Sequence, residues 1–308
     1  MSKFFQQSAR VSEASRERAE YNVVDSVDTL PGRAESPLTP APSAAPPATP
    51  SPVSSAVLAA VKSVREMSTE DPIPESKARM KHSPFEFSVF SQGDFVQPIA
   101  EAYRTLRTRL LRAQATKGVR SVVITSSILG EGKTFTSSNT AVCLSQLHNT
   151  RVLLIDGDLR TGGLSHLYKE EQAPGLADAL EGRCDFSEVT MSTPIKNLYF
   201  VPMGESDVNA SELFAGARWK QFMEWATSQF TLTLVDAPPL TMLSDTELIT
   251  AACDAVLAVV RTRRAPREVV EQAAHRLEKQ KLLGVVLNCV DISRMNGYGR
   301  YYNSYQKR

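Results

Sequence analysis

The sequence predicts an α/β protein with a mostly parallel sheet and helices on both faces of that sheet. Short apolar runs rich in β-branched residues alternate along the chain with longer segments of helical periodicity, which is typical of strands joined by crossover helices. An aspartate directly follows each of the runs 152–155 and 231–235, and the run 121–125 leads into a glycine-rich turn. Because ligands bind at the carboxyl ends of strands in such sheets, we expect the functional site there.

The glycine-rich turn has the composition of a phosphate-binding loop. It follows an apolar strand and is followed by Lys-Thr and a helical run, the order that places backbone N–H groups and a helix N-terminus around an anion. The lysine can reach the β and γ phosphates of a nucleotide, and the threonine hydroxyl can ligate Mg²⁺. We therefore expect the nucleotide to contact Gly130, Glu131, Gly132, Lys133, Thr134 and Phe135.

The match to the phosphate-loop pattern is imperfect at one position. The pattern GxxxxGK[ST] asks for glycine where this chain has Ser127. Serine is small enough for close backbone approach, although a positive φ costs it more than it costs glycine. An ordinary strand–turn–helix junction with a surface lysine is the structural alternative.

Three aspartates follow the apolar runs. Asp156 and Asp158 follow the run 152–155. Asp236 follows the run 231–235, with one alanine between it and two prolines. Mg²⁺ takes hard oxygen ligands, and a phosphoryl acceptor needs a carboxylate that orients and deprotonates it. The alternative for the first two is a turn that favours Asp and Gly for backbone reasons.

Two further features allow more than one interpretation. Asn288 lies near the end of the last apolar strand; a buried amide needs partners, and an adenine edge or a structural hydrogen bond would serve equally. Glu101, Arg104 and Arg107 share one face of a predicted helix. That face could be solvated, with a weak internal ion pair, or it could contact a neighbouring subunit.

Composition divides the chain into three predicted parts. Residues 1–80 include a stretch rich in Pro, Ala, Ser and Thr at 31–52 and should form a disordered arm, because such a segment buries too little apolar surface to offset its ordering entropy. Residues 81–290 carry the alternating pattern of the folded domain. Residues 291–308 are predicted to form a flexible tail.

The tail contains half of the eight tyrosines of the chain, Tyr298, Tyr301, Tyr302 and Tyr305. These rings have no apolar neighbours with which to form a core. They could be exposed phosphate acceptors, or they could stack back onto the domain.

Overall composition excludes several classes of function. The formal net charge is +1, so nothing favours a nucleic-acid partner, and we expect none. The four cysteines have no zinc-ligand spacing, and a reducing cytosol fits them. No run approaches the ~20 apolar residues that span a bilayer. We expect a cytoplasmic protein whose attachment to the inner face of the plasma membrane depends on a partner.

Taken together, these motifs resemble those of the bacterial tyrosine kinases, a family of P-loop proteins related to the MinD/ParA ATPases. The resemblance extends from about residue 98 to the C-terminus. It rests on the helix E101-x-x-R104-x-x-R107, the loop LGEGKT (129–134), DGDLR (156–160), LVDAPP (234–239), VVLN (285–288) and the terminal tyrosines.

The resemblance implies roles for these residues. Lys133, Asp156 and Asp158 would be catalytic, ATP and Mg²⁺ would be the cofactors, and Thr134, Asp158 and Asp236 would hold the metal. The tail tyrosines would be phosphorylated in trans within a ring, an octamer in the family, in which Glu101, Arg104 and Arg107 lie between subunits. The enzyme would regulate capsule or exopolysaccharide synthesis and export, with a membrane activator or polysaccharide co-polymerase and a phosphotyrosine phosphatase as partners.

Two departures from the family pattern and two alternative functions accompany this resemblance. The family commonly shows Arg-Pro after the position of Arg160, where this chain has Thr161-Gly162. Many members carry a fused transmembrane module, so a separate membrane protein is the expected activator. A MinD/ParA-like positioning ATPase is one alternative, but such proteins carry a second lysine at the position of Ile128. A nucleotide-binding ring scaffold without kinase activity is the other alternative.

Overall fold

The computed structural model describes residues 78–91, 97–241 and 244–290. The strands are β1 Ser121–Ser126, β2 Val152–Asp156, β3 Met191–Ser192, β4 Leu198–Val201, β5 Leu232–Asp236, β6 Ala255–Arg261 and β7 Leu282–Asn288. The helical elements are η1 Pro84–Phe87, η2 Val89–Ser91, α3 Gln97–Lys117, α4 Lys133–Ser145, α5 Gly163–Tyr168, α6 Leu176–Glu181, α7 Ala210–Ala215, α8 Ala217–Gln229, α9 Asp245–Ala251 and α10 Arg267–His275.

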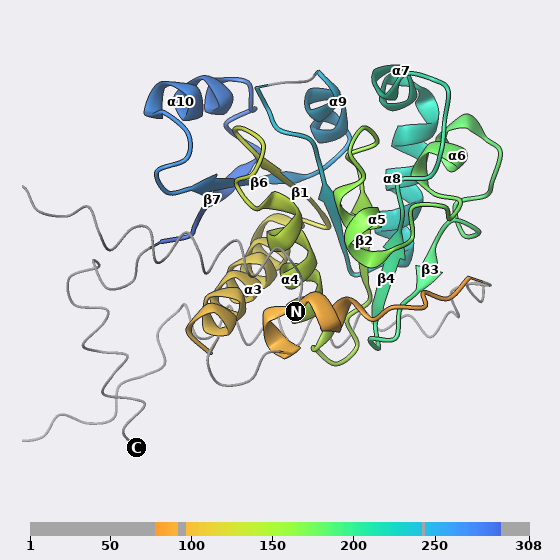
Figure 1. Cartoon of the computed structure of the whole chain (residues 1–308), viewed down its shortest axis with the longest axis horizontal. Helices are drawn as coiled ribbons and strands as arrows, with labels where there is room; N and C mark the ends of the chain where they lie inside the picture. Colours follow the sequence, from red (N-terminus) through yellow and green to blue (C-terminus); the bar gives the residue numbers. More distant parts are fainter. Residues whose placement is uncertain (1–77, 92–96, 242–243, 291–308) are drawn as a thin grey trace, which may run out of the picture. The chain divides into compact units, whose positions relative to one another are not determined.

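The strands form one sheet in the order β3-β4-β2-β5-β1-β6-β7 (Figure 1). Every neighbouring pair is parallel except β3 and β4, which are antiparallel. The register sets Asp156 of β2 opposite Asp236 of β5, and Asp236 opposite Ile124 of β1. The carboxyl ends of β1, β2 and β5 therefore lie side by side, as the sequence predicted.

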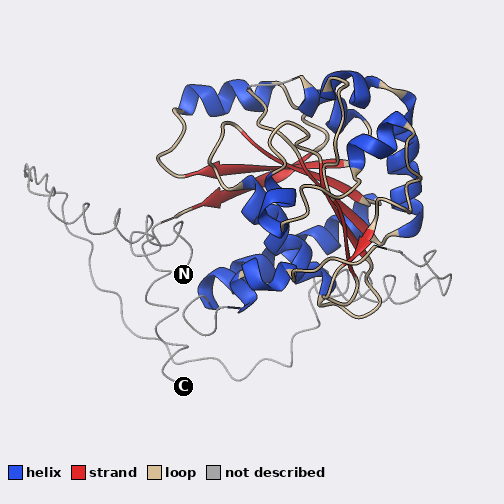
Figure 2. Ribbon diagram, turned by 45° about the vertical axis from the view of Figure 1, so that its right-hand side comes forward, coloured by secondary structure: helices blue, strands red, loops and turns tan. Residues whose placement is uncertain are grey.

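Helices cover both faces of the sheet (Figure 2), and each face has its own apolar core. On one face Leu110 of α3, Val142 of α4 and Leu164 of α5 pack with the strand residues Ile124 and Leu154. The opposite core joins the other strand positions to helices α6 to α10. All residues of β1, β2 and β5 are buried, which explains why their sequences are continuous apolar runs rather than alternating ones. The predicted α/β class is confirmed.

Several sequence predictions lie at or beyond the limits of the described residues. The predicted arm includes residues 78–80, but Arg79 forms a bridge to Ser192 and Met80 is buried. The rest of the predicted arm and the whole tail, with Tyr298, Tyr301, Tyr302 and Tyr305, lie outside the described ranges.

Across the described ranges, no helix is both long enough and apolar enough to cross a membrane.

Candidate active site

The predicted phosphate-binding loop connects β1 to α4. Gly130 and Gly132 both have positive φ, +80° and +92°, a region that glycine enters without the steric cost that a Cβ imposes. Gly132 directly precedes α4, whose first residue is Lys133. The loop therefore delivers its backbone and the positive end of the helix to one point, as a phosphate site requires.

Glu131 braces this loop from inside. Its side chain is fully buried, and its carboxylate accepts hydrogen bonds from the backbone N–H groups of Ser127 at 2.7 Å, Ile128 at 3.0 Å and Arg261 at 3.2 Å. The sequence predicted a nucleotide contact for Glu131. The carboxylate fixes the shape of the loop, and a contact between the backbone of Glu131 and a phosphate stays a prediction.

Asn288 fastens the same loop to the end of β7. Its side-chain amide donates to the carbonyl oxygen of Glu131 at 2.9 Å, and its Oδ1 accepts from the N–H of Cys289 at 2.8 Å. A Cβ on Gly132 would lie 2.1 Å from Asn288 Nδ2, so this close approach requires glycine. These contacts support the structural interpretation of Asn288; a contact with adenine stays a prediction.

Lys133 joins the loop to two of the three predicted acids. Its Nζ lies 2.9 Å from Oδ2 of Asp158 and 3.5 Å from Oδ2 of Asp236, and only 8% of the residue is exposed. Burial by itself lowers the pKa of Lys133, but the charges of Asp236 and Asp158 outweigh burial and raise that pKa to about 12. The ammonium group is therefore charged at neutral pH.

Asp236 also binds two hydroxyl groups of α4. Its Oδ2 accepts from Thr134 Oγ1 at 2.8 Å, and its Oδ1 accepts from Ser137 Oγ at 2.9 Å. Burial raises the pKa of Asp236, and Lys133 with the two hydroxyls counteracts that rise. Sequence reasoning missed Ser137, although it lies one helical turn after Lys133 and hence on the same side of α4.

Asp156 is oriented differently from Asp158. Its Oδ2 accepts from both the backbone N–H and the hydroxyl of Ser165, each at 2.7 Å. Burial, reinforced by the charge of Asp236, raises the pKa of Asp156 to about 7 against the opposing hydrogen bonds from Ser165. Asp156 thus secures α5 next to the site, and Ser165 is a second residue that sequence reasoning did not identify.

The remaining predicted residues lie apart from this cluster. Phe135 of α4 is 42% exposed. On α3, Arg104 pairs with Glu101 at 2.9 Å, and Arg107 donates to the carbonyl oxygen of Cys143 in α4. Glu101 and Arg104 therefore form the internal ion pair that spacing allowed, and their role between subunits stays a prediction.

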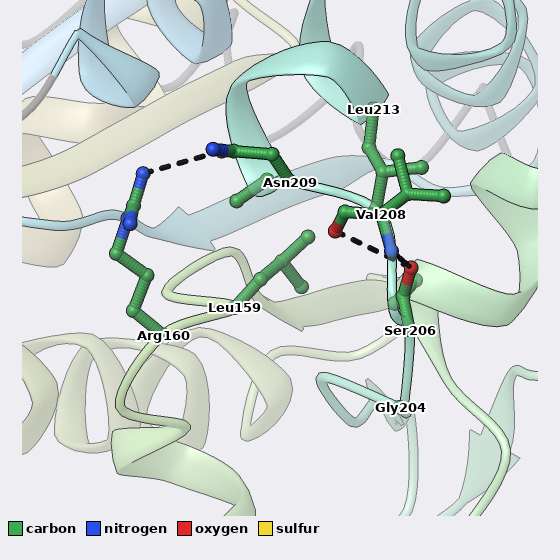
Figure 3. Close-up of a pocket in the computed structure, with 9 residues that line it drawn as sticks. Leu159, Arg160, Gly204, Ser206, Val208, Asn209 and Leu213 are labelled. Atoms are coloured by element: carbon green, nitrogen blue, oxygen red, sulfur yellow. Dashed lines mark hydrogen bonds between the residues drawn. The ribbon is translucent and has the colours of Figure 1, made fainter.

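A cavity of about 250 Å³ lies beside the acidic motif (Figure 3). Leu159 and Arg160, which directly follow Asp158, form one wall, and residues 204–213 form much of the other. Arg160 Nε donates to Oδ2 of buried Asp245 at 2.8 Å, and its Nη2 lies 3.4 Å from Asn209 Oδ1. Arg160 thereby joins the exit of β2 to the start of α9.

The clustered residues fit a magnesium nucleotide. The loop offers backbone amides and one ammonium group to phosphates, and Thr134 and Asp236 offer hard oxygen atoms next to them. No group of three or more His, Cys, Asp or Glu side chains in the described ranges is arranged as a metal site. This is compatible with Mg²⁺ in nucleotide sites, which takes one or two carboxylates and completes its shell with waters and substrate phosphates.

Comparison with known proteins agrees with this geometry. Residues 119–283 match a family model described as an AAA domain. The CpsD tyrosine-protein kinase of Streptococcus pneumoniae serotype 4 is 33% identical over 67% of this chain and 90% of that protein. The putative tyrosine-protein kinase EpsB of Ralstonia solanacearum is 36% identical over 68% of this chain, but the chain covers only 28% of that longer protein.

A solved structure shares the fold. The kinase domain of the Escherichia coli tyrosine kinase ETK superposes with a TM-score of 0.59 at 31% identity, covering 62% of this chain and 75% of that domain. The chain shares the fold and the phosphate-binding loop of these proteins, and its 33% identity to CpsD extends over 90% of that protein. The chain therefore belongs to the family of bacterial tyrosine-protein kinases of the CpsD and EpsB type.

Proposed function

We propose that this chain is an ATP-dependent protein-tyrosine autokinase that phosphorylates its own C-terminal tyrosine cluster. The observation that carries the proposal is the meeting of Lys133, Asp158 and Asp236 at the phosphate-binding loop. A kinase needs a cation for the phosphates and a carboxylate for the acceptor close together. This cluster supplies both.

In this proposal the residues of the site have different roles in phosphoryl transfer. Lys133 and the loop amides bind the β and γ phosphates, and Thr134, Asp158 and Asp236 hold Mg²⁺, which neutralises charge on those phosphates. Asp158 orients the acceptor phenol and takes its proton. The phenol oxygen forms a bond to the γ-phosphorus as the bond from that phosphorus to the β–γ bridging oxygen breaks, and ADP leaves. Asp156 supports this geometry through Ser165.

The acceptors in this proposal are Tyr298, Tyr301, Tyr302 and Tyr305. The active site of a neighbouring subunit phosphorylates them in trans within a ring oligomer. The subunits of the ring contact each other through the face of α3 that carries Glu101, Arg104 and Arg107. A phosphorylated tail would accumulate about −2 charge per phosphotyrosine, which favours dissociation of the ring. Capsule or exopolysaccharide synthesis is the process that we propose it regulates, in the cytoplasm at the inner face of the plasma membrane. A separate membrane activator and a phosphotyrosine phosphatase complete the proposed system.

Incubation with labelled ATP and Mg²⁺, followed by detection of phosphotyrosine, tests the proposal. We expect the chain to label itself, Lys133→Met to abolish labelling, and a tail with all four tyrosines changed to phenylalanine to lose most of it. Tyr199→Phe, which changes a tyrosine packed against Phe230, is the matched control and should label normally. Normal labelling of the tyrosine-free tail would contradict the acceptor assignment.

Mixing the site variant Lys133→Met with the tyrosine-free variant tests transfer in trans. Lys133→Met retains the tail, and the tyrosine-free variant retains the site, so label on the tail of the former requires transfer between copies. Phosphate release without any labelling would indicate a positioning ATPase instead, and nucleotide binding without turnover would indicate a scaffold.

A further inference from the structure

The turn between β6 and α10 lies directly against the phosphate-binding loop. The N–H of Arg261 donates to the Glu131 carboxylate, and its Nη1 lies 3.4 Å from the carbonyl oxygen of Gly130. The next residue, Thr262, donates its N–H to the Asn288 carbonyl oxygen at 3.0 Å. These contacts fix the start of the turn against both the loop and the end of β7.

The same turn carries a dense group of cations. Arg261, Arg263, Arg264 and Arg267 fall within seven residues, and all four are exposed. Only Arg267 has an acidic partner for its side chain among the described residues, Glu271 at 2.7 Å. Unpaired guanidinium groups beside a binding loop are suited to an anion that arrives from outside the chain.

Arg264 is the member of this group that reaches the loop. A Cβ built on Gly130 would lie 3.3 Å from its Nη2 and 3.7 Å from its Nε. The guanidinium group therefore packs on the glycine at the centre of the phosphate-binding loop. Because Gly130 has no Cβ, it leaves space for this arginine and also adopts its positive φ without strain.

A further cation here would add to the positive charge that Lys133 and a Mg²⁺ ion bring to the phosphates. Lys133 is the one ammonium group that the described residues place among Asp158 and Asp236, and it pairs with both carboxylates. A nucleotide triphosphate adds several negative charges to that surplus of acids. A guanidinium fork can bind two phosphate oxygens at once and keeps its charge at any physiological pH.

We infer that Arg264 is a nucleotide-positioning residue, held against the loop by the turn that Arg261 and Glu131 fix, and that its guanidinium group binds the phosphates of the nucleotide. The inference rests on the proposed function insofar as that function requires ATP to bind at this loop. It assigns a role to a residue that belongs to none of the motifs recognised in the sequence.

Binding of ATP and ADP to the full chain, measured by calorimetry without turnover, tests this role. Loss of one charge-assisted contact to a phosphate should raise Kd about tenfold in Arg264→Ala. Arg264→Lys keeps the charge but loses the two-pronged guanidinium group, so its Kd should lie between that of Arg264→Ala and that of the unchanged chain. Arg267→Ala removes an equal charge from the same segment, and its Kd should stay within about twofold because its partner is Glu271.

The salt dependence of binding gives a second readout. Arg264→Ala should show a shallower dependence of Kd on salt concentration than Arg267→Ala, because one ionic contact is missing. Equal affinity and equal salt dependence for Arg264→Ala and the unchanged chain would overturn the inference. Failure of the unchanged chain to bind ATP would overturn the proposed function instead, so the two failures are distinguishable.

A folding control accompanies these measurements. Arg264 is exposed and makes no side-chain hydrogen bond or ion pair within the described residues, so the thermal midpoint of Arg264→Ala should match that of Arg267→Ala. If Arg264→Ala lowers the thermal midpoint, the affinity of Arg264→Lys for ATP becomes the deciding measurement. Full affinity in Arg264→Lys together with unchanged salt dependence would also contradict a bidentate phosphate contact.

Discussion

Lys133 Nζ lies 2.9 Å from Asp158 Oδ2, and this buried ion pair joins the start of α4 to the exit of β2. The two residues are 25 positions apart in the sequence. Their contact places the cation of the phosphate-binding loop and a carboxylate of the acidic motif in one site.

Lys133→Met should remove nucleotide binding and also destabilise the fold. The substitution leaves Asp158 and Asp236 buried without their counter-charge, and breaking a buried pair in this way costs about 3 kcal/mol. Chemical denaturation measures the loss, and calorimetry measures ATP binding. Lys220→Met is the control, because Lys220 is 77% exposed and lies 3.9 Å from Glu224; equal effects of the two substitutions would contradict the role of the buried pair.

Gly132→Ala should abolish ATP binding, whereas Gly118→Ala should not. Both glycines have positive φ, +92° and +69°, but a Cβ at Gly132 meets Asn288 at 2.1 Å and a Cβ at Gly118 meets nothing within 4 Å. Each substitution lowers the free energy of unfolding by about 1 kcal/mol, because alanine is strained at a positive φ. Only Gly132→Ala also displaces the loop. Titration with ATP compares the two. Retained affinity in Gly132→Ala would show that the loop tolerates displacement of Asn288.

Glu131→Ala should loosen the phosphate-binding loop without removing any group that contacts a phosphate. Three backbone N–H groups lose their acceptor, one of them buried and two partly buried, and leaving the buried donor unsatisfied costs about 2 kcal/mol. Hydrogen exchange at Ser127 and Ile128 should accelerate, and ATP affinity should fall. Glu224→Ala, at an exposed glutamate of α8, is the control. Unchanged exchange in Glu131→Ala would indicate that the loop holds its shape by other contacts.

Arg160→Ala should destabilise the protein at neutral pH and much less in acid. Burial acts to raise the pKa of Asp245, but hydrogen bonds from Arg160 and Ser211 outweigh burial and hold that pKa below its usual value. A lowered pKa in the folded state contributes stability above the unfolded value of about 3.9, and this stability is lost as pH falls through the folded pKa.

We therefore expect a loss of about 1 kcal/mol at pH 7, since Arg160 is partly exposed, and a smaller loss below about pH 4. Urea denaturation across this pH range gives the comparison. In an Asp245→Asn background the same arginine substitution should have little effect at any pH. A pH-independent loss would assign the destabilisation to packing rather than to the ion pair.

The sequence by itself determined the sheet, the loop and the identity of the acids. Continuous β-branched runs specify strands buried on both faces, and the order strand, glycine loop, Lys-Thr, helix specifies a phosphate-binding loop, because these are local properties of the chain. The placement of Asp236 beside Lys133 followed from the same reasoning, since exits of parallel strands share one edge of a sheet.

Only the tertiary structure decided which partners these side chains contact. Only Gly157 separates Asp156 from Asp158, yet the carboxylate of Asp156 binds Ser165 and that of Asp158 binds Lys133. Glu131 and Asn288 brace the loop through their side chains, and their contacts with a nucleotide stay predictions. No sequence motif pointed to the packing of Arg264 on Gly130. In each case the partner lies on another element, and spacing along one strand or loop carries no information about which element packs against it.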